Sequence, residues 1–207
     1  GAPIEAAPLG IGRELFAVDN AGSYAMLNAD TGKLLWRGQF YAGVSADPVF
    51  ADGFIVVASE DQSLYSLGQV NGKDRWTAFR SEARLNVPPL AHNGGILLNE
   101  PGIDLVGIDG ETGEAGWRYD GDVQPFAADN RMVLARGPKT IVAVGFNDGT
   151  VLNQVPTREL VVARSDDQGR LLLCDAEGTL MRLSPASPTA SGPVVVEAPA
   201  AEPAAAP

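Results

Sequence analysis

The feature that most constrains this 207-residue sequence is an internal repeat of about 40 residues. Four turn glycines follow one another at intervals of 40, 41 and 36 residues, and four prolines elsewhere in the unit keep the same intervals. A ladder of apolar residues steps by 40, 41, 36 and 39 residues. Three markers in one register indicate a repeat protein. The markers are Gly32, Gly72, Gly113 and Gly149; Pro8, Pro48, Pro89 and Pro125; and Tyr24, Leu64, Leu105, Ile141 and Leu180.

Each unit contains four short apolar segments separated by turn residues. In the second unit these segments are 47–50, 54–58, 63–67 and 74–79, and they are rich in β-branched and aromatic residues. Between them stand Asp-Gly, Asp-Gln and Asn-Gly pairs, which suit tight turns. A repeat of this length with four strands predicts an all-β fold, a β-propeller of four-stranded antiparallel blades.

The repeat predicts four complete blades and a partial fifth. We expect blades over residues 4–40, 44–80, 85–120, 122–158 and 160–184, the last with three strands. In the fourth unit Asn153 stands where the first three have Trp36, Trp76 and Trp117. Residues 185–207 contain 6 prolines and 8 alanines and predict a disordered tail, with Val194–Val196 as one candidate edge strand.

Two segments carry a resemblance to a known family. Residues 27–36 (LNADTGKLLW) and 108–117 (IDGETGEAGW) are similar to the tryptophan-docking motif of PQQ-type propeller repeats. In that family the tryptophan of one blade stacks over the peptide of a neighbouring blade's glycine. The resemblance therefore implies a structural blade-docking role for Trp36, Trp76, Trp117, Gly32, Gly72, Gly113 and Gly149.

In its series of repeats the chain resembles the BamB-like outer-membrane-protein assembly factors, which are eight-bladed periplasmic lipoproteins. In that family the last blade ends after its third strand, and an N-terminal segment supplies the closing strand. The resemblance implies that this chain is the C-terminal portion of a ring of seven or eight blades. It also implies a periplasmic or other extracytoplasmic location, with a lipid anchor on a segment outside this chain. A closed five-bladed ring is the alternative.

Composition argues against nucleic-acid binding, membrane association and a quinone cofactor. The chain has 26 acidic against 15 Lys and Arg residues, a net charge of −11, which disfavours nucleic acid and anionic membrane surfaces as partners. No apolar run is long enough to span a bilayer. The lone Cys174 excludes an internal disulfide. The vicinal-cysteine lid that the resemblance implies for quinoprotein dehydrogenases therefore cannot form, and no cofactor is expected.

No catalytic, cofactor-binding or metal-binding residue is predicted. The three tryptophans occur one per blade, which indicates packing rather than a shared ligand platform. His92 is the only histidine and falls in a turn, and Cys174 lies in a strand without a catalytic partner. The acidic clusters fall in turns or loops, where solvation explains them: Asp109 to Glu114, Asp120 and Asp122, and Asp166–Asp167.

The sequence thus predicts a non-enzymatic, acidic scaffold whose loops and ring faces bind protein partners. A BamB-like role implies an outer-membrane assembly machine as the partner, and exposed strand edges could capture unfolded substrate. The less regular loops Gln39–Ser45, Arg80–Leu85 and Pro101–Asp104 are the candidate contacts. Alternatives are a fragment of a quinoprotein dehydrogenase and an extracytoplasmic sensor or cell-surface propeller domain.

Overall fold

The computed structural model describes residues 1–165 and 170–183, which form nineteen strands in five antiparallel sheets. The first sheet contains β1 (Leu9–Ile11), β2 (Glu14–Val18), β3 (Ser23–Asn28) and β4 (Leu34–Gln39), and the second contains β5 (Val49–Ala51), β6 (Phe54–Ser59), β7 (Ser63–Gly68) and β8 (Phe79–Arg80). The third contains β9 (Leu90–His92), β10 (Gly95–Glu100), β11 (Asp104–Asp109) and β12 (Ala115–Asp120), and the fourth β13 (Gln124–Ala128), β14 (Met132–Gly137), β15 (Thr140–Gly145) and β16 (Val151–Pro156). The fifth has three described strands, β17 (Leu160–Ser165), β18 (Leu171–Asp175) and β19 (Leu180–Leu183).

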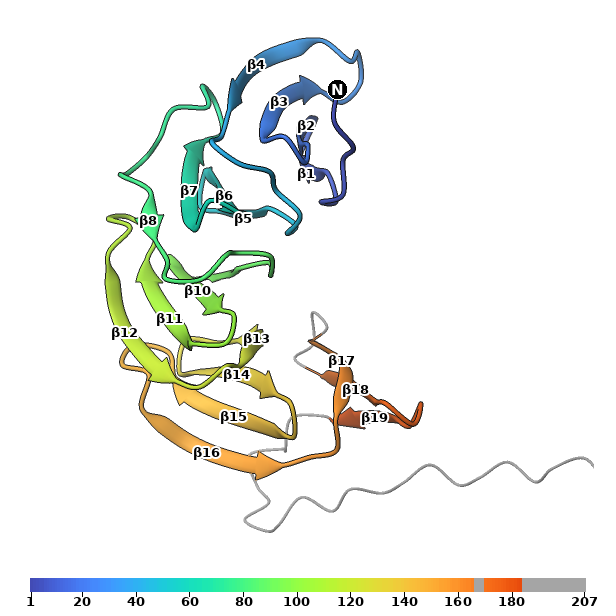
Figure 1. Cartoon of the computed structure of the whole chain (residues 1–207), viewed down its shortest axis with the longest axis vertical. Coiled ribbons are helices and arrows are strands. Elements are labelled where there is room, and N and C mark those ends of the chain that lie inside the picture. The colour runs from blue at the N-terminus through green and yellow to red at the C-terminus, as the bar shows by residue number, and fades with distance from the viewer. Residues whose placement is uncertain (166–169, 184–207) are drawn as a thin grey trace, which may run out of the picture.

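The five sheets follow one another along an open arc (Figure 1). The first strands of consecutive sheets contact one another, β1 with β5, β5 with β9, β9 with β13 and β13 with β17. The outer strands β4, β12 and β16 lie on the convex side. Each sheet pairs its strands in sequence order. This is the arrangement of propeller blades, and it confirms the predicted all-β propeller with four four-stranded blades and a three-stranded fifth.

Local sequence explains the hairpins. In blades 2 and 3 the turn between the first two strands uses Asp52-Gly53 and Asn93-Gly94, and all four residues have positive φ angles of 43°, 91°, 43° and 75°. Two successive positive φ angles are the requirement of a type I′ turn, which matches the twist of the flanking strands. The Asx-Gly pairs of the sequence therefore determine these turns.

The fourth strand of blade 2 is shorter than predicted. We expected a strand over residues 74–79, but β8 contains only Phe79 and Arg80, with a single bridge between Leu67 and Asp74. The first, third and fourth blades carry a register shift at the corresponding place, which is the mark of a β-bulge. In blade 2 the ladder is interrupted around Trp76, which is buried, although the N–H of Arg75 still donates to the carbonyl of Ser66 at 2.9 Å.

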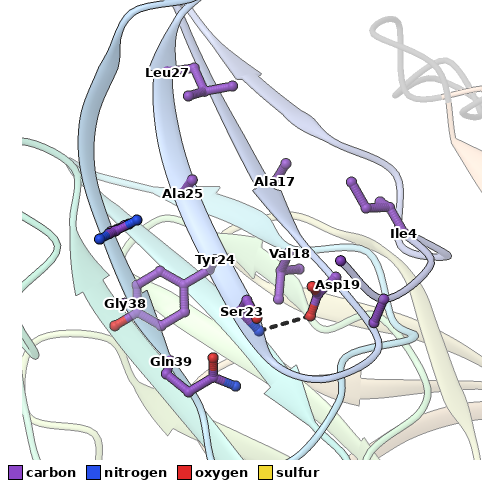
Figure 2. Close-up of a pocket in the computed structure, with 13 residues that line it drawn as sticks. Ile4, Ala17, Val18, Asp19, Ser23, Tyr24, Ala25, Leu27, Gly38 and Gln39 are labelled. Atoms are coloured by element: carbon purple, nitrogen blue, oxygen red, sulfur yellow. Dashed lines mark hydrogen bonds between the residues drawn. The ribbon is translucent and has the colours of Figure 1, made fainter.

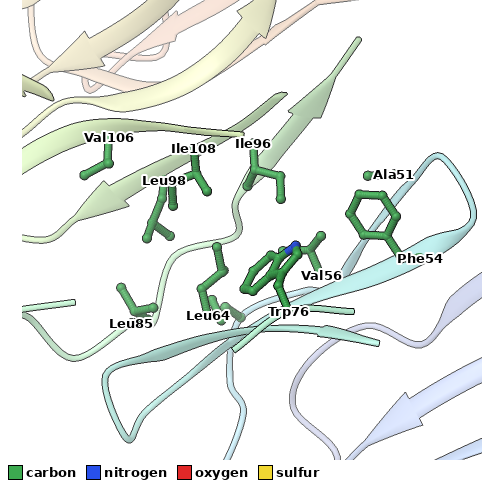
Figure 3. Packing of buried hydrophobic residues seen from close by; sticks show 12 residues of the cluster. Ala51, Phe54, Val56, Leu64, Trp76, Leu85, Ile96, Leu98, Val106 and Ile108 are labelled. Atoms are coloured by element: carbon green, nitrogen blue, oxygen red, sulfur yellow. The ribbon is translucent and has the colours of Figure 1, made fainter. Parts of the chain in front are cut away.

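The core lies between blades rather than within one sheet. Three clusters of buried apolar residues occupy three successive junctions. At the junction of blades 2 and 3, Leu64 and Trp76 from one blade pack against Ile96 and Leu98 from the next (Figure 3). Each tryptophan belongs to a different cluster, so the three do not converge on one site. The predicted tail, residues 185–207 with Val194–Val196, lies outside the described residues, and the blade limits remain predictions.

Candidate functional site: the blade junctions and the loop face

Each tryptophan contacts the following blade in the same way. The indole nitrogen of Trp36 donates a hydrogen bond to the carbonyl of Gln69 at 2.8 Å. Trp76 donates to the carbonyl of Gly110 at 3.1 Å, and Trp117 donates to that of Phe146 at 2.9 Å. In every case the acceptor stands three residues before a turn glycine. The indole is thus oriented by a hydrogen bond as well as by packing.

The turn glycine under each indole could not be replaced without movement. A Cβ atom added to Gly72 would stand 2.6 Å from the ring of Trp36, and one added to Gly113 or Gly149 would stand 2.5 Å from the ring of Trp76 or Trp117. The φ angles of these glycines are 64°, 76° and 67°, in the left-handed region that favours glycine. The short distance to the indole ring and the positive φ angle both favour glycine at these three positions.

Two positions of the repeat differ from this pattern. Gly32 has the same conformation, with a φ of 68°, but a Cβ atom there would meet nothing within 4 Å. Asn153, which replaces the tryptophan of blade 4, is exposed, and its side chain accepts a hydrogen bond from the backbone of Gln154 at 2.8 Å. The junction of blades 4 and 5 therefore lacks an indole.

The opposite ends of the blades form what we call the loop face, residues 39–45, 60–62, 80–85 and 101–103. The backbone N–H of Glu60 donates to the carbonyl of Gly43 at 3.0 Å, and the N–H of Ser81 donates to the carbonyl of Gln62 at 2.8 Å. Both bonds join an inter-blade connection to the same hairpin turn, residues 60–62. Two of the loops predicted as partner contacts, Gln39–Ser45 and Arg80–Leu85, thus lie on either side of one turn.

A carboxylate strengthens this surface between blades 1, 2 and 3. Glu60 accepts a hydrogen bond from the Ser45 hydroxyl at 2.9 Å and pairs with the guanidinium of Arg84. The hydrogen bond from Arg84 outweighs partial burial and lowers the pKa of Glu60 below its ordinary value of 4.5. One side chain therefore links the connection before blade 2 to the connection after it.

A second carboxylate stands 40 residues later and is fully buried. Glu100 has no exposed surface, accepts a hydrogen bond from the backbone N–H of Glu82 at 3.1 Å and pairs with Arg118. Arg118 also pairs with Asp104 at 2.9 Å. A connection from blade 2 is thereby attached to three strands of blade 3.

Electrostatics distinguish the two carboxyl groups of this cluster. Burial alone would raise the pKa of Glu100, but hydrogen bonds from Ser81, Asp104 and Arg118 together lower it. Burial and the neighbouring Glu100 raise the pKa of Asp104. Of the two groups, Glu100 therefore ionises more readily than Asp104.

Sequence reasoning missed Glu60, Glu100 and Arg118. The two glutamates stand at the ends of the apolar runs that form β6 and β10, where an ion is costly unless it is paired. Their spacing of 40 residues is the signal that could have revealed them. The partner Arg118 follows Trp117 as Arg37 follows Trp36, but its role depends on the folding of β12 beside β11.

The remaining sequence candidates lie apart. His92 contacts the Asn130 side chain at 3.1 Å, and Cys174 is half-buried. Asp109 accepts hydrogen bonds within its own turn, and Asp122 accepts one from Asn99 at 3.1 Å. In the described part of the chain, no three His, Cys, Asp or Glu side chains gather as metal ligands. Asp166–Asp167 lies outside the described residues.

Acid is expected to weaken the Glu60 link. The pKa of Glu60 is lower in the folded chain than its ordinary value of 4.5, so its stabilisation is present above pH 4.5 and is lost as the pH falls through the folded-state value. Glu60→Gln should therefore lower the melting temperature at pH 7, and the difference from the parent chain should shrink below pH 4.5. Thermal unfolding followed by circular dichroism between pH 7 and 3 measures this. A difference that stays constant over that range would contradict the assignment.

Comparison with known proteins identifies the family to which this chain belongs. The family model described as outer membrane protein assembly factor BamB matches residues 3–187 of the chain. The chain belongs to this family. A BamB from Burkholderia pseudomallei is 25% identical over 160 residues, which is 72% of this chain and 41% of that protein. The chain spans less than half the length of the BamB relatives it matches.

Solved structures share the propeller fold. The BamB structure from Moraxella catarrhalis superposes with a TM-score of 0.75 at 16% identity, covering 86% of this chain and 60% of that one. A quinohemoprotein alcohol dehydrogenase from Pseudomonas putida superposes with a TM-score of 0.64 at 14% identity, covering 86% and 41%. At these identities the likeness shows the fold alone. Nowhere in residues 1–165 and 170–183 is there a helix that could cross a membrane.

Proposed function

We propose that this BamB-family chain is a non-catalytic scaffold that binds protein partners during outer-membrane protein assembly. Its membership of the BamB family is the observation that carries the proposal. A periplasmic location, with a lipid anchor on another segment of the protein, follows from the same role. The net charge of −11 is more consistent with a scaffold that binds proteins through its loops than with a protein that binds nucleic acid or an anionic membrane surface.

The blades supply rigidity to this scaffold. We propose that Trp36, Trp76 and Trp117 hold consecutive blades together through the turn glycines, and that Gly32 belongs to the same set. The ion pairs of Glu60 and Glu100 hold the loop face at the other end. A surface that is already ordered loses little conformational freedom on binding, which favours affinity.

The loop face carries residues suited to partner contact. Tyr41 is 89% exposed, Ile103 is 36% exposed, and Arg80 and Arg84 are exposed beside them. Tyrosine and arginine are enriched among residues that dominate protein–protein binding energy. We therefore place the partner contact on this face.

Site-specific photo-crosslinking tests this placement. A photoreactive amino acid is introduced at Tyr41 or at Val70, and the protein is expressed in a bacterium with an outer membrane. Val70 is a matched control, because it is also 89% exposed but lies in the β7–β8 turn at the opposite end of the blade. We expect Tyr41 to crosslink to a component of the outer-membrane assembly machine and Val70 not to do so. Equal labelling at both positions, or none at Tyr41, would reject the loop face as the contact.

A ligand titration separates the scaffold from an enzyme. The chain contains one cysteine, so the vicinal-disulfide lid of quinoprotein dehydrogenases cannot form within it. Addition of pyrroloquinoline quinone and Ca²⁺ should change neither the quinone absorbance nor the melting temperature. A clear stabilisation, as a ligand of the folded state produces, would overturn the non-catalytic proposal.

A further inference from the structure

The third strand of blade 5 has an open edge among the described residues. β19 pairs with β18 only, whereas β3, β7, β11 and β15 each lie between two partner strands. It is the last described strand of the arc (Figure 1). Its residue Leu180 is 55% exposed, while the equivalent Leu64 and Leu105 are fully buried. An open edge that carries an exposed apolar residue is a place where another strand can add.

The backbone groups that face this edge belong to Leu180 and Arg182. In an antiparallel pair of strands, hydrogen-bonded residue pairs alternate with non-hydrogen-bonded pairs. The N–H of Asp175 donates to the carbonyl of Thr179 at 3.1 Å, which sets the alternation between β18 and β19. Met181 therefore bonds toward β18, and the N–H and C=O groups of Leu180 and Arg182 point away from it. These are the groups that a fourth strand would bind.

The chain itself contains a segment suited to this edge. Val194–Val196, which lies outside the described residues, is a run of three β-branched residues in an Ala- and Pro-rich stretch that follows β19. Residues 184–192 would connect it to β19. That connection is longer than the about two to five residues of common hairpin loops, so its length allows the return.

Pro193 indicates the register of such a strand. Proline has no backbone N–H, so within a strand it suits a position whose nitrogen points away from the neighbouring strand. The N–H groups of Val194 and Val196 then face β19, opposite Arg182 and Leu180. Because residues opposite each other project to the same face of a sheet, the Val196 side chain would cover that of Leu180.

A hollow on blade 1 is another place where an apolar segment could bind. Its volume is about 760 Å³, and Ile4, Ala17, Ala25 and Leu27 are among the residues that line it (Figure 2). Blade 1 already has four strands, so a segment in this hollow would make side-chain contacts without completing a sheet. The edge of β19 offers backbone hydrogen bonds as well.

The short connection favours Val194–Val196 over a strand from a second copy of the chain. Because residues 184–192 join this segment directly to β19, its effective concentration at the edge is on the order of millimolar, as for other short flexible linkers. A second copy at roughly micromolar concentration competes poorly with a segment held in this way.

We propose that Val194–Val196 is the fourth strand of blade 5 and pairs antiparallel with β19. The backbone N–H and C=O groups of Val194 bond with those of Arg182, and the groups of Val196 bond with those of Leu180. The resemblance described above implies a closing strand from an N-terminal segment, whereas here residues that follow β19 complete the blade. The proposal does not depend on the proposed function.

Amide hydrogen exchange in two proline variants tests this pairing. Val196→Pro removes an N–H that faces β19, and Val195→Pro is the matched control, because the N–H of Val195 points away from β19 in this register. In the parent chain, we expect the amides of Leu180 and Arg182 to exchange at least about tenfold more slowly than in Val196→Pro, because the strand must open before they exchange. Val195→Pro should keep most of this protection.

A disulfide tests the register independently. Met181 and Val195 would form a non-hydrogen-bonded pair with Cα atoms about 4.5 Å apart, which a disulfide can bridge. Cysteines are introduced at both positions in the whole chain with Cys174→Ser, and the control carries Met181→Cys with Ala198→Cys. Without a fixed strand, both disulfides would form almost equally, because loop-closure entropy changes slowly with loop length. We expect the effective concentration of the first pair, measured against glutathione, to be at least about tenfold higher.

Three results would overturn the proposal. The amides of Leu180 and Arg182 can exchange as fast in the parent chain as in Val196→Pro, the two proline variants can behave alike, or the two disulfides can form equally. Light scattering identifies the other occupant. A dimer in which the Leu180 amide stays protected in Val196→Pro would assign the edge of β19 to a second copy.

Discussion

Trp76→Ala is expected to lower the free energy of unfolding by about 3–5 kcal/mol, the range for truncating a buried large aromatic side chain. Trp76 is 8% exposed, packs among residues of blades 2 and 3 and donates a hydrogen bond to Gly110. Its removal leaves a cavity at the junction and an unsatisfied carbonyl. Urea unfolding followed by far-ultraviolet circular dichroism measures the effect.

Two further variants test whether the loss of stability in Trp76→Ala arises at the junction of blades 2 and 3. Val70→Ala in the exposed neighbouring turn should change stability by no more than about 0.5 kcal/mol. Gly113→Ala keeps Trp76 but forces a Cβ atom to 2.5 Å from the indole, so it should also destabilise strongly. If Gly113→Ala behaves like the Val70 variant, the indole does not depend on the glycine beneath it and the docking proposal fails.

Glu100→Leu is expected to cost about 2 kcal/mol, less than the ~3–5 kcal/mol of a fully buried pair, because Arg118 is 42% exposed and keeps Asp104 as a partner. The variant removes the acceptor of the Glu82 N–H as well as the charge. Hydrogen exchange at Glu82 should therefore rise together with the loss of stability. Denaturant unfolding and amide exchange measured on the same samples test both effects.

Glu60→Leu provides the matched comparison, since Glu60 occupies a similar place one blade earlier and is 24% exposed at its side chain. Its partner Arg84 is 65% exposed, so the loss should be no more than about 1 kcal/mol. An equal loss at both positions would mean that burial does not set the strength of these links.

The fold was largely predictable because its markers are local. Turn residues such as Asp52-Gly53 and the glycines under the indoles occur in one register and determine hairpins without information from distant residues. The strand at 74–79 was predicted too long, because the ladder is interrupted around Trp76. Trp36 and Trp117 make the same contact from within β4 and β12, and alternation along the segment gives no sign of this difference.

The candidate site was only partly predictable for a related reason. The glycine and tryptophan positions were found from their register in the repeat, but their docking role came from a resemblance, since nothing in their spacing shows which blade an indole contacts. The carboxylate Glu100 escaped notice because its partners Glu82 and Arg118 lie 18 residues away on either side. Such a cluster exists only once β10, β12 and the preceding loop are in place.

The absence of an indole between blades 4 and 5 has a mechanical consequence. In a linear array of repeats, each interface contributes separately to cooperativity, so the array yields first where neighbouring units are most weakly coupled. Among the described junctions, the one between blades 4 and 5 has Asn153 in place of the tryptophan and is crossed instead by hydrogen bonds from Arg136 to the carbonyls of Leu160 and Val161. We therefore expect force or heat to separate the fifth blade from the fourth before the first four separate from one another.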